Sequence, residues 1–196
     1  ITIPGNILAL SEFLFQSTSI TSFTLNENNE GKEQSLGREV FTNCNSLTKV
    51  NLPMTLTKLS YMTFGHIKVD LELPNTIKSF SKSNLLYNHF TSLTLKGGDN
   101  EILRCENNIL YYYLNLEWQL CAFAGYADND FIISDFCSSF GVLNSPEQDI
   151  FSYYYTIPIL NRKLVIPKNV KNLNEDIFMY CNSLKKVIIY KETSSL

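Results

Sequence analysis

The sequence has 196 residues with a formal net charge of −3, and 44% of its residues are hydrophobic. This length is typical of one domain with a sizeable core, the hydrophobic content excludes a disordered chain, and the acidic balance argues against a nucleic-acid binder. No apolar run reaches the roughly 18 residues that a membrane-spanning helix needs. With 21 asparagines and four alanines, the composition disfavours long helices and favours a β-rich fold.

One pattern recurs along the chain: an apolar residue followed by proline, with further apolar residues four, seven and twelve positions after the first. Its copies begin at Ile3-Pro4, Leu52-Pro53, Leu73-Pro74 and Ile166-Pro167. A unit of about 21 to 23 residues cannot bury its apolar side chains alone, whereas stacked units form a continuous core. The pattern therefore predicts a protein of stacked repeats.

Each full repeat contains an L-x-x-V-x-L segment whose last apolar residues alternate, which is typical of a strand with one buried face. Proline then ends the strand, because it lacks the N–H that a ladder requires. We expect parallel strands of one sheet at residues 20–25, 47–52, 68–73, 90–95, 161–166 and 184–189. The stretch before each phenylalanine, such as residues 36–41, fits one helical or 3₁₀ turn.

The last apolar position of the pattern predicts a stacked column of nearly inaccessible side chains. Its members are Phe15, Phe41, Phe64, Leu85, Phe151 and Phe178. Cys44 and Cys181 share one phase of the repeat and are expected to be small buried hydrophobes. At least four turns of roughly 4.8 Å separate them, which is too far for a disulfide.

Two segments interrupt the repeats. The polar run at residues 26–34 predicts a solvated loop. The longer segment, about residues 96–163, holds Trp118 and tyrosine clusters at 111–113 and 153–155. We expect a hairpin whose alternate tyrosines either pack on the flank of the solenoid or form an aromatic contact patch. The repeat register between about 134 and 160 stays open.

The repeats resemble the BspA-type leucine-rich repeat, most clearly at residues 40–64 and 164–189. Residues 107–111, followed by 120–125, are similar to the longer hairpin-bearing unit of that family. The resemblance implies one leucine-rich repeat solenoid over residues 1–196, α/β leaning β-rich, with a parallel sheet on one face, short helical turns and a hairpin-bearing insertion. Because the chain begins within a repeat and ends just after a strand, we expect it to be a fragment of a longer protein.

Residues that could carry catalysis or hold a metal are few. His66 and His89 are the only histidines, both predicted in loops, and the five cysteines include no C-x-x-C pair. The segment 128–130 lacks the glycine and distal glutamate of a calcium loop, so a hairpin turn is expected there. Nothing in the sequence nominates a nucleophile with a base and an orienting group. We therefore expect no enzyme and no cofactor.

A solenoid of this kind leaves the outward side chains of its sheet free to bind a partner. The outward positions of successive strands are Ser22 and Thr24, Lys49 and Asn51, Asp70 and Glu72, Ser92 and Thr94, then Lys186 and Ile188. We select Lys49, Asn51, Asp70, Glu72, Ser92 and Thr94 on the sheet, with Tyr112 and Trp118 in the insertion, as candidate protein-binding residues. The alternative is an ordinary solvated sheet with cross-strand pairs, such as Lys49 with Asp70 or Glu72.

The family resemblance implies a non-enzymatic adhesion module at the cell surface or outside the cell. Its expected partner is a host-cell or extracellular-matrix protein, with no nucleic acid and no membrane insertion by this segment. The alternative is a cytoplasmic protein-interaction scaffold with the same fold. None of the 21 asparagines lies in an N-x-S/T sequon, which suits a compartment without N-glycosylation. The identity of the partner and the oligomeric state stay open.

Overall fold

The computed structural model describes residues 1–80, 82–85, 90–124, 131–140, 163–171, 173 and 186–190. The chain divides into two compact units. Unit 1 comprises residues 1–110 and 122–125, and unit 2 comprises residues 111–121 and 126–196. The extension of one solenoid over the whole chain stays a prediction.

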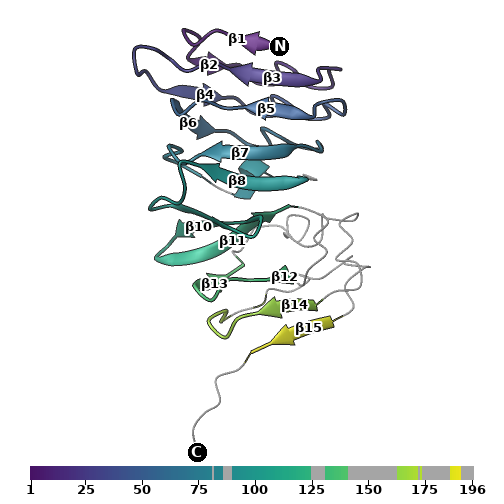
Figure 1. The fold of residues 1–196 in the computed structure, drawn as a ribbon, viewed down its shortest axis with the longest axis vertical. Coiled ribbons are helices and arrows are strands. Elements are labelled where there is room, and N and C mark those ends of the chain that lie inside the picture. The colour runs from purple at the N-terminus through teal and green to yellow at the C-terminus, as the bar shows by residue number, and fades with distance from the viewer. Residues whose placement is uncertain are drawn as a thin grey trace, which may run out of the picture. The chain divides into compact units, whose positions relative to one another are not determined.

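Unit 1 is a β-solenoid whose chain alternates between two parallel sheets (Figure 1). The first sheet, in the order β1-β3-β5-β7-β8, contains β1 (Thr2–Ile3), β3 (Ser22–Leu25), β5 (Lys49–Asn51), β7 (Asp70–Pro74) and β8 (Ser92–Lys96). The second sheet, in the order β2-β4-β6, contains β2 (Ala9–Leu10), β4 (Gln34–Leu36) and β6 (Leu56–Leu59). Each of the first three coils therefore contributes one strand to each sheet.

The strands predicted within residues 20–25, 47–52, 68–73 and 90–95 are confirmed as β3, β5, β7 and β8, and all pair in parallel. Equivalent positions of the repeat meet in the ladder, since Phe23 lies beside Val50 and Leu71 beside Leu93. These four side chains are buried. Strand alternation then turns the residues on either side of each one outward.

The other two predicted strands are β14 (Lys163–Ile166) and β15 (Lys186–Ile189), which pair in parallel. They form a separate three-stranded sheet with β12 (Phe131–Ile132), so the expectation of one sheet for all six strands is wrong. The intervening chain forms a four-stranded sheet in the order β13-β11-β10-β9. Its strands are β9 (Leu103–Glu106), β10 (Ile109–Leu114), β11 (Glu117–Phe123) and β13 (Cys137–Ser139). The strands of this sheet pair with one another, so the parallel ladder of the first sheet ends at β8.

Two-residue connections join β9 to β10 and β10 to β11. Asn107 and Asn108 have φ of 52° and 64°, and Asn115 and Leu116 have φ of 53° and 65°. Two successive residues with positive φ form a type I′ turn, whose twist matches that of a hairpin. Asparagine tolerates this left-handed conformation, whereas leucine rarely adopts it. The hairpin turn predicted at 128–130 lies outside the described residues.

The expected helical turn before each phenylalanine is wrong for the first three coils. Each of these coils has instead two residues with positive φ, four positions apart: Phe13 and Ser17, Glu39 and Asn43, Met62 and His66. Left-handed residues break an α-helical run. The N–H groups of five of these six residues, all except His66, are seen to donate to the next coil. Glu39 N donates to Tyr61 O at 2.9 Å, for example. Among the described residues the only helix is the 3₁₀ turn η1 (Lys82–Leu85).

The predicted column of apolar side chains is present where the structure describes it. The ring of Phe41 stacks on Phe15 and on Phe64, with centroids 5.9 Å and 5.4 Å apart. Phe41, Phe64 and Leu85 are buried, but Phe15 in the first coil is only half-buried. Among the described residues, Phe41 has a stacked ring on both sides and Phe15 has one on one side only. Phe151 and Phe178 lie outside the described residues.

Cys44 is a buried free thiol, as its place in the repeat predicted. Its Sγ donates to the carbonyl oxygen of Phe15 in the preceding coil at 2.9 Å. Cys181 lies outside the described residues, so its separation from Cys44 stays a prediction.

The polar loop at residues 26–34 is exposed at most positions but is anchored by two buried amides. The Asn28 side chain donates to Gly5 O at 2.8 Å and accepts from the backbone N–H groups of Glu30 and Lys32. The Gln34 Nε2 group donates to Ile7 O at 2.9 Å. These bonds give the loop a fixed conformation, which its polarity alone did not indicate.

Candidate protein-binding surface

The outer face of the first sheet of unit 1 carries the predicted binding residues in two columns. Parallel pairing aligns Ser22 with Lys49, Lys49 with Asp70, and Asp70 with Ser92. The second column contains Thr24, Asn51, Glu72 and Thr94. Among the six residues selected from the sequence, Ser92 is half-buried and the other five are exposed. The topology therefore brings all six to one face of one sheet.

The outer face of the first sheet carries positive and negative side chains next to one another. Lys49 lies directly beside Asp70 in the ladder, which is the register that the alternative of ordinary cross-strand pairs expects. Asp70 also accepts a hydrogen bond from the hydroxyl of Thr91. In the second column the Asn51 amide donates to Thr24 Oγ1 at 3.0 Å. The face therefore offers fixed hydroxyl, amide, ammonium and carboxylate groups, and it has no aromatic side chain in either column.

The two residues selected in the insertion differ in accessibility. Trp118 is half-buried, whereas Tyr112 is 6% exposed and its hydroxyl donates to Gln119 Oε1 at 2.9 Å. Burial raises the pKa of Tyr112 because the phenolate would lose its hydration. Tyr112 therefore serves the core of the hairpin. The neighbouring Tyr113 is the exposed member of the tyrosine cluster.

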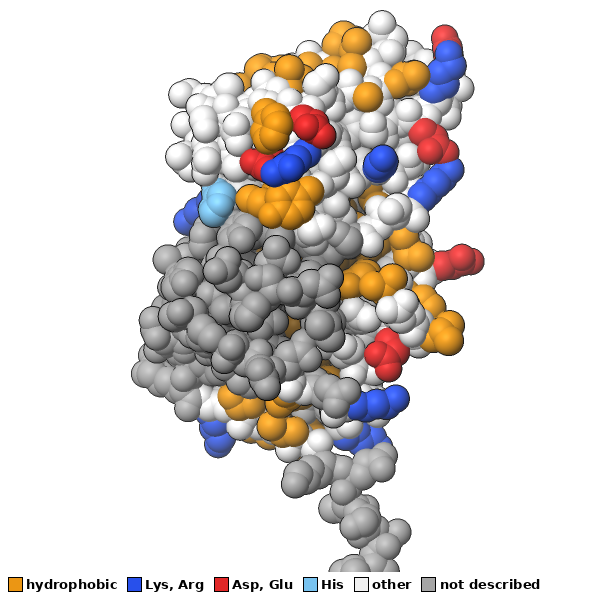
Figure 2. Space-filling model, turned by 180° about the vertical axis from the view of Figure 1, so that it is seen from behind, with side chains coloured by type: hydrophobic (Ala, Val, Ile, Leu, Met, Phe, Trp, Pro, Cys, Tyr) orange, Lys and Arg blue, Asp and Glu red, His pale blue; other side chains and the backbone are white. Residues whose placement is uncertain are grey.

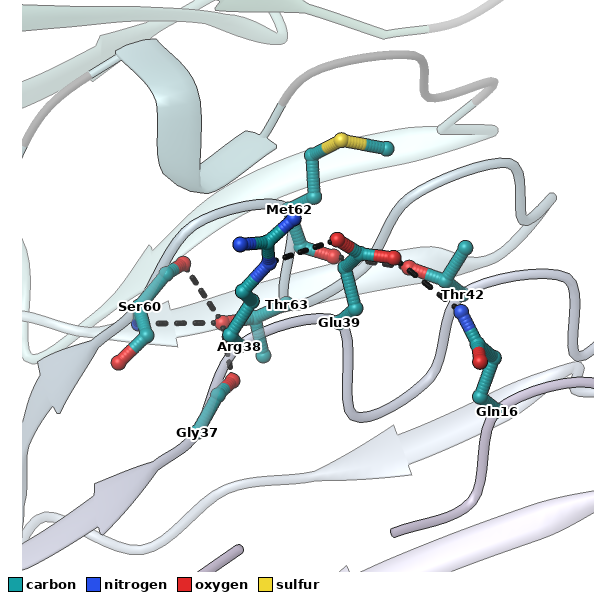
Figure 3. A network of polar contacts seen from close by, with 8 residues as sticks. All are labelled: Gln16, Gly37, Arg38, Glu39, Thr42, Ser60, Met62 and Thr63. Atoms are coloured by element: carbon teal, nitrogen blue, oxygen red, sulfur yellow. Dashed lines mark hydrogen bonds and ion pairs between the residues drawn. The ribbon is translucent and has the colours of Figure 1, made fainter. Parts of the chain in front are cut away.

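A second surface group, absent from the sequence-based selection, lies on the stacked turns of unit 1. The guanidinium of Arg38 lies 5.7 Å from the ring centre of Phe13 and 5.1 Å from that of Tyr61. Its Nε donates to Glu39 Oε1 at 2.8 Å. The other carboxylate oxygen of Glu39 accepts from Gln16 Nε2 at 3.1 Å (Figure 3). Arg38 is thus held between two aromatic rings by a carboxylate that is itself bonded to the preceding coil.

The surroundings of Arg38 combine aromatic and charged chemistry. In the upper part of Figure 2, hydrophobic side chains border a cluster of acidic and basic ones. The hydrogen bond to Glu39 raises the pKa of Arg38, and burial opposes that shift. Arg38 and Tyr61 each stand three positions before a column phenylalanine, Phe41 and Phe64. Phe13 stands two positions before Phe15 and so does not share this phase, which means that repeat phase alone does not reveal the group.

Threonine hydroxyls bond the turns beneath this group to one another. Thr42 Oγ1 donates to Met62 O at 3.1 Å. Thr63 Oγ1 lies 3.2 Å from Gly37 O and accepts from Ser60 N at 3.1 Å (Figure 3). Both threonines are buried, so these bonds pair their hydroxyls with backbone groups of neighbouring turns.

Groups suited to catalysis or metal binding do not gather in the described part of the chain. No set of three His, Cys, Asp or Glu side chains lies close enough there to hold a metal ion. His66 is exposed on a turn, and His89 lies outside the described residues. Burial raises the pKa of the Cys105 thiol to about 12, and the charges of Asp99 and Glu106 add to this effect. A thiol with this pKa is a poor nucleophile at neutral pH.

Comparison with known families explains the repeat pattern. The sequence profile described as the BspA type Leucine rich repeat region matches six copies, over residues 6–117 and 148–196. The chain belongs to the BspA-type leucine-rich repeat family. Proteins with this repeat and a solenoid fold are typically non-enzymatic, and leucine-rich repeats generally serve protein interaction. No sequence among the curated proteins matches the chain.

One solved structure of low sequence identity resembles the fold, and a second aligns only weakly. The pneumococcal vaccine antigen PcpA superposes with a TM-score of 0.63 at 14% identity, over 96% of this chain and 50% of that one. A leucine-rich cell surface protein from Faecalibacterium prausnitzii A2-165 gives a TM-score of 0.38 at 14% identity, over 98% of this chain and 79% of that one. The chain thus spans about half the length of PcpA, and the likeness shows the fold alone.

The described residues contain no helix long and apolar enough to cross a membrane.

Proposed function

We propose that this BspA-type repeat chain is a non-enzymatic binding module of a cell-surface protein, and that its partner is a host-cell or extracellular-matrix protein. The observation that supports the proposal most is the polar outer face of the first sheet, where strand register fixes Lys49, Asp70 and their neighbours in two columns. Side chains on a rigid ladder lose little conformational entropy on binding. The name of PcpA, a vaccine antigen, supports the surface location.

The chemistry of this face favours a partner with charges of both signs. Lys49 stands beside Asp70, and Glu72 lies two residues further along β7. A flat face with alternating charge matches a partner surface with the opposite alternation, which gives specificity more than affinity. Exposed charges are screened over about 8–10 Å at physiological salt, so such a contact weakens as ionic strength rises.

The test is binding of the purified chain to immobilised fibronectin, laminin and collagen and to cultured epithelial cells. The sheet variant carries Lys49→Ala and Glu72→Ala, which remove one positive and one negative charge. The control variant carries Lys32→Ala and Glu30→Ala, which remove an exposed ion pair from the polar loop with the same change in net charge. We expect the sheet variant to bind at least about tenfold more weakly than the wild type, and the control to bind normally.

Salt provides the second measurement. We expect binding of the wild type to fall as sodium chloride rises from about 50 to 500 mM, because the contacts are exposed charges.

If the sheet variant binds as tightly as the wild type, and circular dichroism shows that both variants are folded, this face is not the contact. A wild-type chain that binds neither matrix proteins nor cells would contradict the adhesion function.

A cytoplasmic interaction scaffold is the second candidate. Cys44, Cys105, Cys121 and Cys137 are free thiols, which suits a reducing compartment. Surface biotinylation of intact cells that express the full-length protein separates the two candidates. Labelling supports the surface module, and protection from labelling until the cells are lysed supports the scaffold.

A further inference from the structure

Leu116 combines two unfavourable features at one position of unit 2. It occupies the second central position of the type I′ turn between β10 and β11, with φ of 65°, where glycine is favoured. A leucine in the left-handed region is strained, because its Cβ approaches the following carbonyl oxygen. Its side chain is also 86% exposed, so burial within the chain does not offset the strain. Strain at an exposed residue points to a role outside the fold.

Two neighbours extend the apolar surface around Leu116. Tyr113 is 39% exposed and Leu114 is 44% exposed, both at the end of β10. We define Tyr113, Leu114 and Leu116 as the hairpin tip. Isolated exposed apolar residues are ordinary. Here three occur within four positions, and because Tyr113 and Leu114 are consecutive in a strand, they flank the exposed turn on opposite sides.

One face of the hairpin supports the tip through aromatic contacts that reach the core. The ring centroids of Tyr113 and Trp118 are 5.3 Å apart, and those of Trp118 and Phe136 are 5.7 Å apart. The centroid of Phe136 in turn lies 4.8 Å from that of Tyr111, which is fully buried. The hydroxyl of Tyr111 accepts from Ser134 N at 2.9 Å. Tyr113 is therefore held by a continuous aromatic chain anchored in the interior of unit 2.

Hydrogen bonds support the tip from the other face of the same hairpin. Gln119 accepts from the Tyr112 hydroxyl at 2.9 Å, and its Nε2 donates to the carbonyl oxygen of Leu114 at 3.4 Å. The latter bond fixes the backbone just before the turn. The hairpin tip is thus preorganised, so that docking it into a pocket immobilises few groups.

We propose that the hairpin tip is the apolar anchor of the chain, and that it inserts into an apolar pocket on a protein partner. The inference rests on the proposed protein-binding function and deepens it, because it adds an apolar contact of a kind that the polar sheet face does not offer. Tyrosine on a rigid support is favoured among residues that dominate binding energy, and a flanking leucine fills a pocket by shape. A protein partner fits better than a bilayer for two reasons. Residues 109–123 contain no lysine or arginine, and Glu117 beside the tip lies 3.9 Å from Lys171 (Oε1 to Nζ), so the tip carries no excess of positive charge that would attract lipid headgroups.

The test uses Leu116→Gly, which fits the turn without strain. We expect its midpoint of thermal unfolding to equal or exceed that of the wild type, because glycine removes the strain. We expect its binding to the matrix protein or cell that the wild type binds to fall by at least about tenfold. Leu14→Ala is the matched control, since Leu14 is an exposed leucine of unit 1 and its loss should leave binding unchanged. Vesicles of phosphatidylcholine form a second arm, in which no binding is expected.

The outcomes separate this inference from the proposed function. A lower unfolding midpoint for Leu116→Gly assigns Leu116 to the fold and overturns the inference. Unchanged binding by Leu116→Gly, with weakened binding by the sheet variant, also overturns it but leaves the proposed function in place. Sedimentation of the wild type with the vesicles, but not of Leu116→Gly, overturns the protein partner in favour of a lipid surface. A wild type that binds none of the probes contradicts the proposed function and this inference together.

Discussion

The regular coils at residues 1–96 and the hairpin strands at residues 103–123 are both β-structure, but their cores are built differently. In the coils, contacts come from residues about one repeat apart, as in the stack of Phe15, Phe41 and Phe64. In the hairpin strands, contacts come from residues close in sequence, as in the pairs Tyr112–Gln119 and Tyr113–Trp118. Burial in the coils therefore depends on neighbouring coils, whereas the hairpin holds much of its structure locally.

The half-buried Phe15 shows what this difference means for the coils. It occupies the same phase as the fully buried Phe41 but lies in the first coil. Burial at a given repeat position therefore depends on the coils stacked beside it, as expected for a solenoid. The hairpin instead uses type I′ turns and cross-strand pairs, which form without a neighbouring repeat.

The largest expected effect is at the centre of the coils. Phe64→Ala should lower the free energy of unfolding by about 3–5 kcal/mol, because it removes a fully buried ring and leaves a cavity next to Phe41. Urea denaturation followed by circular dichroism measures this loss. Phe13→Ala is the control, and its loss should be below about 1 kcal/mol because Phe13 is 44% exposed. A loss below about 1 kcal/mol for Phe64→Ala would show that the column does not support the coils.

A smaller effect is expected in the hairpin. Tyr112→Phe should cost about 1–2 kcal/mol, because it leaves the buried Oε1 of Gln119 without the Tyr112 hydroxyl as a donor. The same denaturation experiment on Tyr113→Phe should show little change, since Tyr113 is exposed. Equal stability of the two variants would mean that the Tyr112–Gln119 bond does not brace the hairpin.

The smallest expected effect concerns β9, at the start of the hairpin segment. Burial raises the pKa of Cys105 from its ordinary 9.0 to about 12, so the fold favours the neutral thiol. The buried neutral thiol therefore stabilises the fold fully below about pH 9. This stabilisation is lost as the pH rises from 9 toward 12, because the unfolded chain then gains stability by ionising Cys105. Alkylation by iodoacetamide at pH 8, mapped by mass spectrometry, should modify Cys105 at least about tenfold more slowly in the native chain than in urea. Equal rates would place Cys105 in a solvated position.

The repeat pattern was enough to predict β3, β5, β7 and β8, four of the five strands of the first sheet, but it did not predict the second sheet. The alternation around Phe23, Val50, Leu71 and Leu93 placed the buried face correctly, and it also placed Lys49, Asn51, Asp70 and Glu72 on the outer face. These inferences succeed because strand alternation has a period of two, so one known inward residue determines its neighbours.

The turns could not be predicted in the same way. Residues 36–41 have a composition that one helical turn could accept, yet Glu39 adopts a φ of 53°. This conformation is stabilised by hydrogen bonds between coils, in which Glu39 N donates to Tyr61 O and Phe41 N donates to Thr63 O. A local pattern carries no information about partners in the next coil, so the left-handed conformation was not visible in it.

The candidate binding residues likewise fall into those that the sequence predicted and those that only the tertiary structure placed. The sequence determined that this chain is a repeat solenoid with a polar outer face, because both properties follow from a period that recurs along the chain. The tertiary structure alone decided that Tyr112 is buried while Tyr113 is exposed, and that Arg38 lies between Phe13 and Tyr61. It also decided that Leu116 stands at the end of a strained turn. These features depend on which strand or coil lies next to each residue, and that is fixed only when the coils stack and the hairpin strands pair.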